Sequence, residues 1–278
     1  MVPAAEKLPE KLPVPTAAAA EEERYQLTLP DRRFLSGPNS RWQELKTLGL
    51  IMLDFLRGLR TFHFVGPCVT VFGSARLQEG HPWYELARKT AGEIARLGFT
   101  VMTGGGPGIM EAANRGAKEA GGRSVGINIV LPHEQQVNPW LDASVDMRYF
   151  FTRKTLLIKY SYAFVVMPGG LGTMDELFEA LTLIQTKKIR NFPVILMGVD
   201  YWTPMMSAIR RMKEDGLISP VDLDLLVVTD SIPEAMRVLQ EKAIVQFNLK
   251  RVKIPHCQPL LGEKRLFRGS FQFSEGKD

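Results

Sequence analysis

The chain has 278 residues, of which 45% are hydrophobic and 23% charged, a composition typical of a soluble globular protein. This length suits one large α/β domain with extensions, or two small domains. No apolar run approaches the ~18–20 residues of a transmembrane helix, and no signal-peptide core precedes the first charges, so neither membrane insertion nor secretion is indicated. The two cysteines, Cys68 and Cys257, offer neither a disulfide framework nor a metal site, which fits a reducing cytoplasm.

The formal net charge of +5 is unevenly distributed. Residues 246–278 hold seven basic and three acidic residues, whereas residues 1–40 hold five basic and six acidic residues. The region between them is therefore close to neutral. A basic tail is more often solvated than bound to nucleic acid, so a nucleic-acid partner is not indicated. If the tail did bind nucleic acid, the affinity would be sensitive to salt and would vanish on deletion of residues 246–278.

The first 66 residues precede the regular part of the chain. Residues 1–40 are rich in Pro and Ala without sustained periodicity, which predicts a mostly disordered lead. Residues 41–66 form the predicted N-terminal helical extension. Within 41–60, an apolar set recurs at helical spacing: Trp42, Leu45, Leu48, Met52, Phe55, Leu56 and Leu59. This amphipathic helix can pack on the main domain or on a second subunit.

Residues 67–245 alternate between apolar strand patterns and helical patterns. Strands are predicted at 69–72, 99–103, 124–130, 145–149, 163–167, 193–198 and 225–229. Helices are predicted at 82–97, 108–120, 151–160, 172–187, 202–214 and 232–243. This alternation predicts an α/β fold with a doubly wound, mainly parallel sheet of about seven strands, Rossmann-like in organisation. Residues 246–278 lose the alternation and are predicted to form an irregular, basic C-terminal arm.

Three unusual turns follow predicted strands: 73–76, 104–108 and 168–176. Ligands of doubly wound sheets bind beyond the carboxyl ends of the strands, so these turns mark a candidate site. No P-loop pattern occurs anywhere in the chain. The dinucleotide fingerprint also fails, because its third glycine position is Ile109 when counted from Gly104 and Asp175 when counted from Gly170. A redox enzyme therefore loses most of its support.

The 168–176 turn, Pro-Gly-Gly-Leu-Gly-Thr-Met-Asp-Glu, leads from an apolar strand into a helix. Its glycines allow the backbone to approach a ligand, and the unpaired N–H groups at a helix start attract an anion such as phosphate. Asp175 and Glu176 are expected in the first helical turn. There a carboxylate often only complements the helix dipole, so position alone leaves open whether Glu176 is a cap or a catalyst.

Two other features also have two interpretations. Arg153 and Lys154 are expected at a helix start, where cations oppose the dipole; they are either a solvated basic pair or ligands of a phosphate or base. Glu111 either complements a helix dipole or accepts hydrogen bonds from ribose hydroxyls.

The four histidines have no metal-ligand spacing, and Ser74 lacks a nucleophile elbow and a partner histidine, so a metal site and a serine hydrolase are not indicated.

Taken together, the motifs resemble the LOG family of cytokinin riboside 5′-monophosphate phosphoribohydrolases and related nucleotide N-glycosidases, which are often labelled lysine decarboxylases. The resemblance rests on residues 103–114 (TGGGPGIMEAAN), on Arg153-Lys154 and on the complete PGGxGTxxE signature at 168–176. It extends from about Cys68 to Ala243. Nothing in the chain indicates a pyridoxal-phosphate site that would support the decarboxylase label.

The resemblance implies hydrolysis of the N-glycosidic bond of a purine or cytokinin nucleoside 5′-monophosphate, such as AMP, without a metal or organic cofactor. The alternative is a non-catalytic nucleotide or cofactor carrier with the same cradle. Glu176 and Arg153 are the implied catalytic residues, Lys154 an implied support of the phosphate, and Glu111 the implied ligand of the ribose. The complete set of expected substrate-binding residues is Gly73, Ser74, Gly104, Gly105, Gly106, Gly108, Glu111, Lys154, Met167, Gly169, Gly170, Gly172 and Thr173.

The chain departs from the family pattern at Tyr162, where members often have an acidic residue before the key strand. This departure leaves the base preference open. The GGGPGIMEAANRGA form resembles the longer bacterial-type members, in which AMP or another purine monophosphate is an alternative to a cytokinin. The resemblance also implies at least a homodimer, with the helix after the 168–176 turn near the interface.

Overall fold

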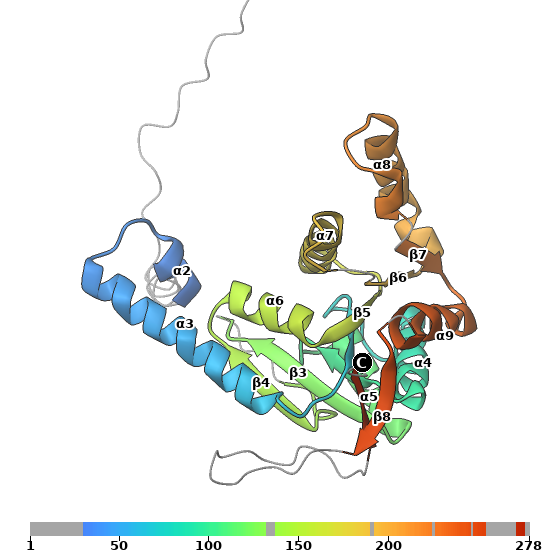
Figure 1. The fold of residues 1–278 in the computed structure, drawn as a ribbon, viewed down its shortest axis with the longest axis horizontal. Coiled ribbons are helices and arrows are strands. Elements are labelled where there is room, and N and C mark those ends of the chain that lie inside the picture. The colour runs from blue at the N-terminus through green and yellow to red at the C-terminus, as the bar shows by residue number, and fades with distance from the viewer. Residues whose placement is uncertain are drawn as a thin grey trace, which may run out of the picture.

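The computed structural model describes residues 30–131, 137–189, 192–223, 226–245, 247–253 and 271–275. A seven-stranded sheet forms its centre, with the strand order β4-β3-β2-β1-β5-β6-β7 and every pair parallel (Figure 1). The strands are β1 Cys68–Phe72, β2 Thr100–Thr103, β3 Arg123–Ile129, β4 Ala143–Met147, β5 Ser161–Val166, β6 Val194–Met197 and β7 Leu226–Thr229. The predicted doubly wound parallel sheet is confirmed.

Helices alternate with these strands as the sequence predicts. They are α4 Pro82–Leu97, α5 Ile109–Glu119, α6 Phe150–Lys159, α7 Leu171–Gln185, α8 Val199–Glu214 and α9 Ile232–Leu239. A π-helical segment, Gln240–Val245, continues from α9. None of the helices in the described part of the chain is long and apolar enough to cross a lipid bilayer.

The sheet is buried on both faces. Along β5, Ala163 and Val165 contribute to one hydrophobic cluster, whereas Phe164 and Val166 contribute to the other. The first cluster contains residues of α4, α5 and α9, and the second contains residues of α6, α7 and α8. Burial on both faces explains why these strands are almost continuously apolar in sequence.

The strand order reverses at β1. The chain builds β1 to β4 outward in one direction and then returns to place β5 beside β1 on its other side. The turns that follow β1, β2 and β5 therefore lie at or next to the crevice where ligands bind in such sheets. The three turns singled out in the sequence are these three.

Two N-terminal helices precede the sheet: α2 Pro30–Leu35 and α3 Arg41–Thr61. The short α2 lies within residues 1–40, where the sequence shows no sustained periodicity; residues 1–29 lie outside the described part of the chain. Helix α3 begins with a capping box in which Ser40 and Gln43 exchange side-chain to backbone hydrogen bonds.

A buried ion pair fastens α3 to the main domain. The side chain of Asp54 is fully buried; its Oδ1 lies 2.6 Å from Arg148 Nη1, and its Oδ2 accepts a 2.7 Å hydrogen bond from the Arg148 backbone N–H. A Cβ atom at Gly58 would overlap Leu156 of α6, so a glycine permits the close packing of these two helices. Of the periodic apolar set, Phe55 packs against the core, whereas the other side chains face outward.

The C-terminal region contains two short strands that the loss of alternation does not predict. Strands β8 Leu249–Lys253 and β9 Phe271–Glu275 pair antiparallel as a separate two-stranded sheet. The residues between them lie outside the described part of the chain.

Candidate functional site

Three glycine-containing turns meet at the carboxyl edge of β1, β2 and β5. The Ser74 N–H donates to Pro168 O at 3.0 Å, which joins the β1 turn to the β5 turn. Ser74 O in turn accepts from the Ile109 N–H, the first residue of α5, at 3.0 Å. The β1 turn is therefore hydrogen-bonded to both of its neighbours, and all three form one framework.

A cavity of about 690 Å³ opens over this framework. It is lined by Phe72, Gly73, Ser74, Ala75, Arg76, Met110, Arg153, Gly170, Leu171, Gly172, Thr173 and Glu176. Of the residues expected to act in catalysis or substrate binding, the lining includes Glu176, Arg153, Gly73, Ser74, Gly170, Gly172 and Thr173. Residues from four separate segments of the sequence thus come together as the motifs suggest.

The N-terminus of α7 forms one wall of this cavity. Its N-cap residue is Gly170, and no side chain caps this helix end. A Cβ atom at Gly169 would overlap the Thr173 side chain and approach Ser74 N to 3.0 Å, so the preceding turn is closely packed. Tyr201 donates a hydrogen bond to Gly169 O and holds the turn from outside. An uncapped helix start with a positive dipole end facing a cavity is suited to an anion.

Glu176 does not lie in the first turn of α7, contrary to the prediction from sequence. The helix begins at Leu171, one residue earlier than expected, and its first turn contains no acidic residue. Glu176 therefore lies in the second turn, where the dipole is largely compensated by neighbouring peptide groups. The interpretation of Glu176 as a dipole cap loses its geometric basis.

Glu176 and Arg153 form a buried pair beside the cavity. Glu176 Oε1 lies 3.4 Å from Arg153 Nη1, and the side chains are 6% and 13% exposed. Burial raises the pKa of Glu176 to about 7, against the opposing effects of Arg153 and Lys154. Burial also lowers the pKa of Arg153. A carboxyl group with a pKa near neutrality can exchange a proton at physiological pH.

Arg153 is oriented by two contacts from the sheet edge. Its Nε donates to Ile127 O, near the end of β3, at 2.9 Å. On the opposite side, the space above Gly104 is filled by the guanidinium, because a Cβ atom at Gly104 would overlap Arg153 Nη2. Gly104 thus makes room for the cation that pairs with Glu176.

This packing predicts the effect of Gly104→Ala. The added methyl group displaces Arg153 from Glu176, so the nucleotide cleavage that the resemblance implies is expected to lose roughly 10–100-fold in kcat/KM with the fold retained. Steady-state kinetics together with thermal unfolding measure both. Gly92→Ala in α4 is the matched control, because a Cβ atom there meets no atom closer than 3.4 Å. Equal activity of the Gly104 variant and the wild type would contradict the role of this glycine.

Gly105 and Gly106 do not line the cavity, and a buried polar network holds their turn instead. Asn138 Nδ2 donates to Gly105 O and to Gly106 O, both at 3.0 Å, and also to Asn114 Oδ1 at 2.9 Å. Thr103 Oγ1 donates to Asn114 Oδ1 at 2.7 Å. Sequence patterns do not reveal this role of Asn138, because its hydrogen bond to Asn114, 24 positions away, leaves no periodic signal.

Lys154 does not line the cavity that holds Glu176, although the resemblance implied support of the phosphate. Its Nζ lies 2.9 Å from Asp175 Oδ1 and 2.8 Å from Glu179 Oε2, both on α7. Burial lowers the pKa of Lys154, but these two carboxylates raise it on balance. Lys154 thus ties α6 to α7 beside the Arg153–Glu176 pair.

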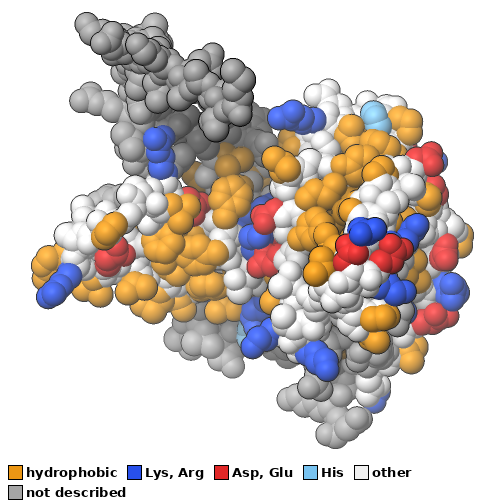
Figure 2. All heavy atoms as spheres, turned by 90° about the horizontal axis from the view of Figure 1, so that it is seen from above, with side chains coloured by type: hydrophobic (Ala, Val, Ile, Leu, Met, Phe, Trp, Pro, Cys, Tyr) orange, Lys and Arg blue, Asp and Glu red, His pale blue; other side chains and the backbone are white. Residues whose placement is uncertain are grey.

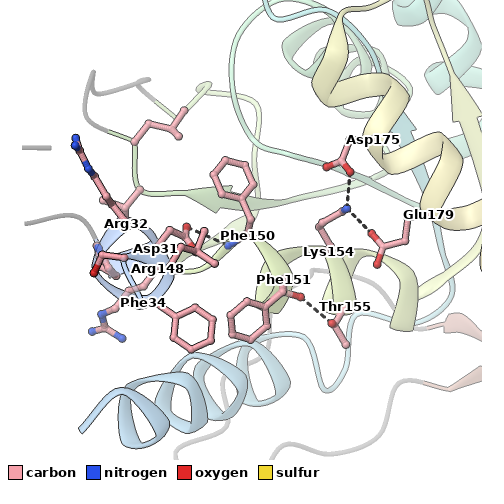
Figure 3. A pocket seen from close by; sticks show the side chains of 15 residues that line it. Asp31, Arg32, Phe34, Arg148, Phe150, Phe151, Lys154, Thr155, Asp175 and Glu179 are labelled. Carbon is pink, nitrogen blue, oxygen red and sulfur yellow. Dashed lines mark hydrogen bonds and ion pairs between the residues drawn. The ribbon is translucent and has the colours of Figure 1, made fainter. Parts of the chain in front are cut away.

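A second cavity of about 830 Å³ lies next to the ion pairs of Lys154, on the side toward α2. Figure 3 shows Lys154, Asp175 and Glu179 at one end of it, with Phe34, Phe150 and Phe151 toward the N-terminal helices. Asp31 of α2 accepts a hydrogen bond from the Phe150 N–H at 3.3 Å, so the N-terminal helices reach the start of α6.

The remaining expected residues lie near the framework without lining its cavity. Glu111 is in the first turn of α5, as expected, next to Met110, which does line the cavity. Met167 is fully buried in the core. Gly108 has φ +68°, and a Cβ atom there would lie 2.5 Å from Ser74 O, so its role is conformational.

Tyr162 lies far from the site, at the opposite end of its strand. It is the second residue of β5, whereas the glycine turn follows the last. Its ring packs edge-on against Phe247, with centroids 5.1 Å apart. The side chain at this position therefore contacts the C-terminal region and does not line the cavity.

No group of three or more metal-ligating side chains occurs among residues 30–131, 137–189 and the shorter described segments. The polar groups that line the first cavity are instead the backbone N–H groups at the start of α7, the Thr173 and Ser74 hydroxyls, the Arg76 and Arg153 guanidinium groups and the Glu176 carboxylate. This set fits a phosphorylated organic ligand.

Comparisons with protein families and with individual proteins find relatives of this chain. The family model described as "Possible lysine decarboxylase" matches residues 110–239. A cytokinin riboside 5′-monophosphate phosphoribohydrolase of Mycobacterium tuberculosis is 32% identical over 160 residues, which cover 55% of this chain and 83% of that protein. One from Rhodococcoides fascians is 30% identical over 62% of this chain and 88% of its own length.

Solved structures with a similar fold include the molybdenum cofactor binding protein of Rippkaea orientalis. It is 24% identical, covers 63% of this chain and 96% of its own, and superposes with a TM-score of 0.49. At this level the likeness carries no argument about ligand or activity. The matches to the two sequence relatives, in contrast, cover 83% and 88% of the length of those proteins. The chain therefore belongs to the LOG family, together with the cytokinin riboside 5′-monophosphate phosphoribohydrolases.

Proposed function

We propose that the chain is a nucleoside 5′-monophosphate N-glycosidase that hydrolyses a purine or N6-modified purine ribonucleotide to free base and ribose 5-phosphate. The observation that carries the proposal is the buried Glu176–Arg153 pair, which shares a cavity with the uncapped N-terminus of α7. A phosphate site alone needs neither group. A glycosidase needs a carboxylate close to the sugar, because the transition state resembles an oxocarbenium ion.

The binding step follows from the polarity of α7. The 5′-phosphate accepts hydrogen bonds from the N–H groups at 170–172 and from the Thr173 hydroxyl, and the helix dipole favours its charge. Glu111, next to Met110 in the cavity lining, is the proposed acceptor for the ribose hydroxyls. Glu176, one turn beyond the phosphate site, then lies at the sugar.

The chemical step breaks the C1′–N bond and leaves the bonding electron pair on the base. Ionised Glu176 stabilises the positive charge that develops on the ribose and accepts a proton from the attacking water, whose oxygen bonds to C1′. The departing base takes up a proton from solvent, and Glu176 later releases to solvent the proton that it received, so the overall reaction consumes one water molecule. Arg153 orients the substrate, and its own fixed position depends on Ile127 O and Gly104. The ion pairs of Lys154 hold α6, which carries Arg153, in a fixed position relative to α7, which carries Glu176.

The direct test is incubation of the purified protein with AMP, other nucleoside monophosphates and N6-prenyl-AMP, with free base and ribose 5-phosphate measured by chromatography. Release in a 1:1 ratio from at least one of these is expected. Nucleotide binding without release from any of them would replace the enzyme with the alternative, a non-catalytic nucleotide carrier.

A further inference from the structure

One side of α3 exposes large hydrophobic side chains along its whole length. Trp42, Leu45, Leu48, Met52, Leu56 and Leu59 are between 36% and 81% exposed. They recur at intervals of three and four residues and so form a continuous stripe along one face, which we call the α3 stripe. Figure 2 shows hydrophobic side chains gathered at the end of the molecule that α2 and α3 form.

The α3 stripe cannot be buried by rotation of the helix. The opposite face is fixed by the Asp54–Arg148 ion pair and by the close packing at Gly58, both against the main domain. Breaking such a buried ion pair would leave an uncompensated charge in the interior. The stripe is therefore presented outward by a rigid helix, as a contact surface for another molecule.

We infer that the α3 stripe is covered by the α3 stripe of a second copy of this chain. At roughly 100 Å² for each apolar side chain, the six residues offer about 600 Å², within the range of about 600–1,000 Å² that each partner contributes to a stable interface. A uniformly apolar helix face is self-complementary about a two-fold axis, as an interface between identical subunits requires.

The ends and the middle of the stripe fit an antiparallel pairing. Trp42 and Arg60 lie 18 residues apart, which is five helical turns, so both lie on the same side of α3. A two-fold axis near the middle of the helix places Trp42 of one copy beside Arg60 of the other, a favourable cation–π arrangement. A Cβ atom added at Gly49, near this axis, would meet no other atom within 4 Å, so this position leaves room for close approach of the second helix.

The flanks of the stripe distinguish a second copy from a lipid surface. Lys46 and Arg57 are exposed at its border. In a symmetric pair these cations repel one another, so added salt strengthens the pairing by screening them. On an anionic lipid surface the same cations would attract, and added salt would weaken binding.

The test is the mass of the full chain in solution by light scattering, for wild type, Leu48→Glu and Leu56→Glu. Each variant is expected to halve the mass of the assembly, with unchanged thermal unfolding of the monomer fold. Leu217→Glu is the matched control, because Leu217 is 70% exposed and lies outside α3; it should leave the mass unchanged. The wild-type assembly should persist or grow between 50 mM and 500 mM NaCl.

Three results would overturn the inference: a monomeric wild type, an unchanged mass in both α3 variants, or salt-sensitive cosedimentation of wild type with anionic phosphatidylserine vesicles that Leu48→Glu abolishes. A further variant, Gly49→Cys, keeps the test independent of disrupted packing. Under oxidising conditions it should give a disulfide-linked dimer on a non-reducing gel, whereas Leu217→Cys should not.

Discussion

Replacing Glu176 by glutamine is expected to lower turnover of the nucleotide by at least ~100-fold while nucleotide affinity stays within a few-fold of wild type. Glutamine keeps the size of the side chain and an oxygen for Arg153, which lies 3.4 Å away. In the proposed mechanism it removes the negative charge that stabilises the ribosyl cation and the group that accepts a proton from water. Base release gives turnover, and calorimetric titration with a nonhydrolysable nucleotide gives affinity.

The matched control for this experiment is Asp175→Asn. Asp175 is the adjacent carboxylate, but its side chain is 58% exposed and pairs with Lys154 beside the second cavity. Its loss should change turnover only a few-fold. For the wild type, kcat/KM should fall on the acid side of about pH 7, where Glu176 becomes protonated. Unchanged turnover in Glu176→Gln, or an equal loss in Asp175→Asn, would refute the catalytic assignment.

Replacing Glu176 by glutamine is also expected to remove a pH dependence of the stability of the fold. The pKa of Glu176 is raised from 4.5 to about 7 in the folded chain, chiefly by burial, so the folded state binds the proton more tightly than the unfolded chain does. The stability that this proton binding provides is present below pH 4.5 and is lost as the pH rises through 7. Glutamine stays neutral and avoids this loss.

Between pH 5 and pH 8, the free energy of unfolding of Glu176→Gln should therefore rise relative to wild type by roughly 2–3 kcal/mol. Urea unfolding at both pH values measures this difference, and Asp175→Asn again controls for the change in net charge. A difference that is the same at both pH values would mean that Glu176 is not held protonated by burial.

The sequence predicted the sheet and its helices because the controlling interactions are local or periodic. Burial of β5 on both faces requires the apolar run around Phe164, and the packed side of α7 requires Leu177, Ala180 and Ile184 at helical spacing. The glycine turns could also be predicted, because only a residue without a side chain at position 169 can pack so closely against Thr173.

What the sequence could not predict depends on contacts between distant segments. The position of Lys154 is set by Asp175 and Glu179 on another helix, and a start of α7 only one residue earlier moved Glu176 out of the first turn. Asn138 supports the glycine turn through hydrogen bonds spanning 32 and 33 residues. The exposed face of α3 could not be predicted either, because amphipathicity alone does not show which side of the helix contacts the domain.

The ion pair between Asp54 and Arg148 also constrains the order of events during synthesis. Its partners are 94 residues apart, so α3 leaves the ribosome long before the strand and helix that receive it. At about 5–20 residues per second, this interval is roughly 5–20 s. Throughout that time the nascent chain carries an amphipathic helix whose docking site on the main domain has not yet been synthesised. Chaperone occupancy on ribosome-bound chains should accordingly be highest before Arg148 emerges.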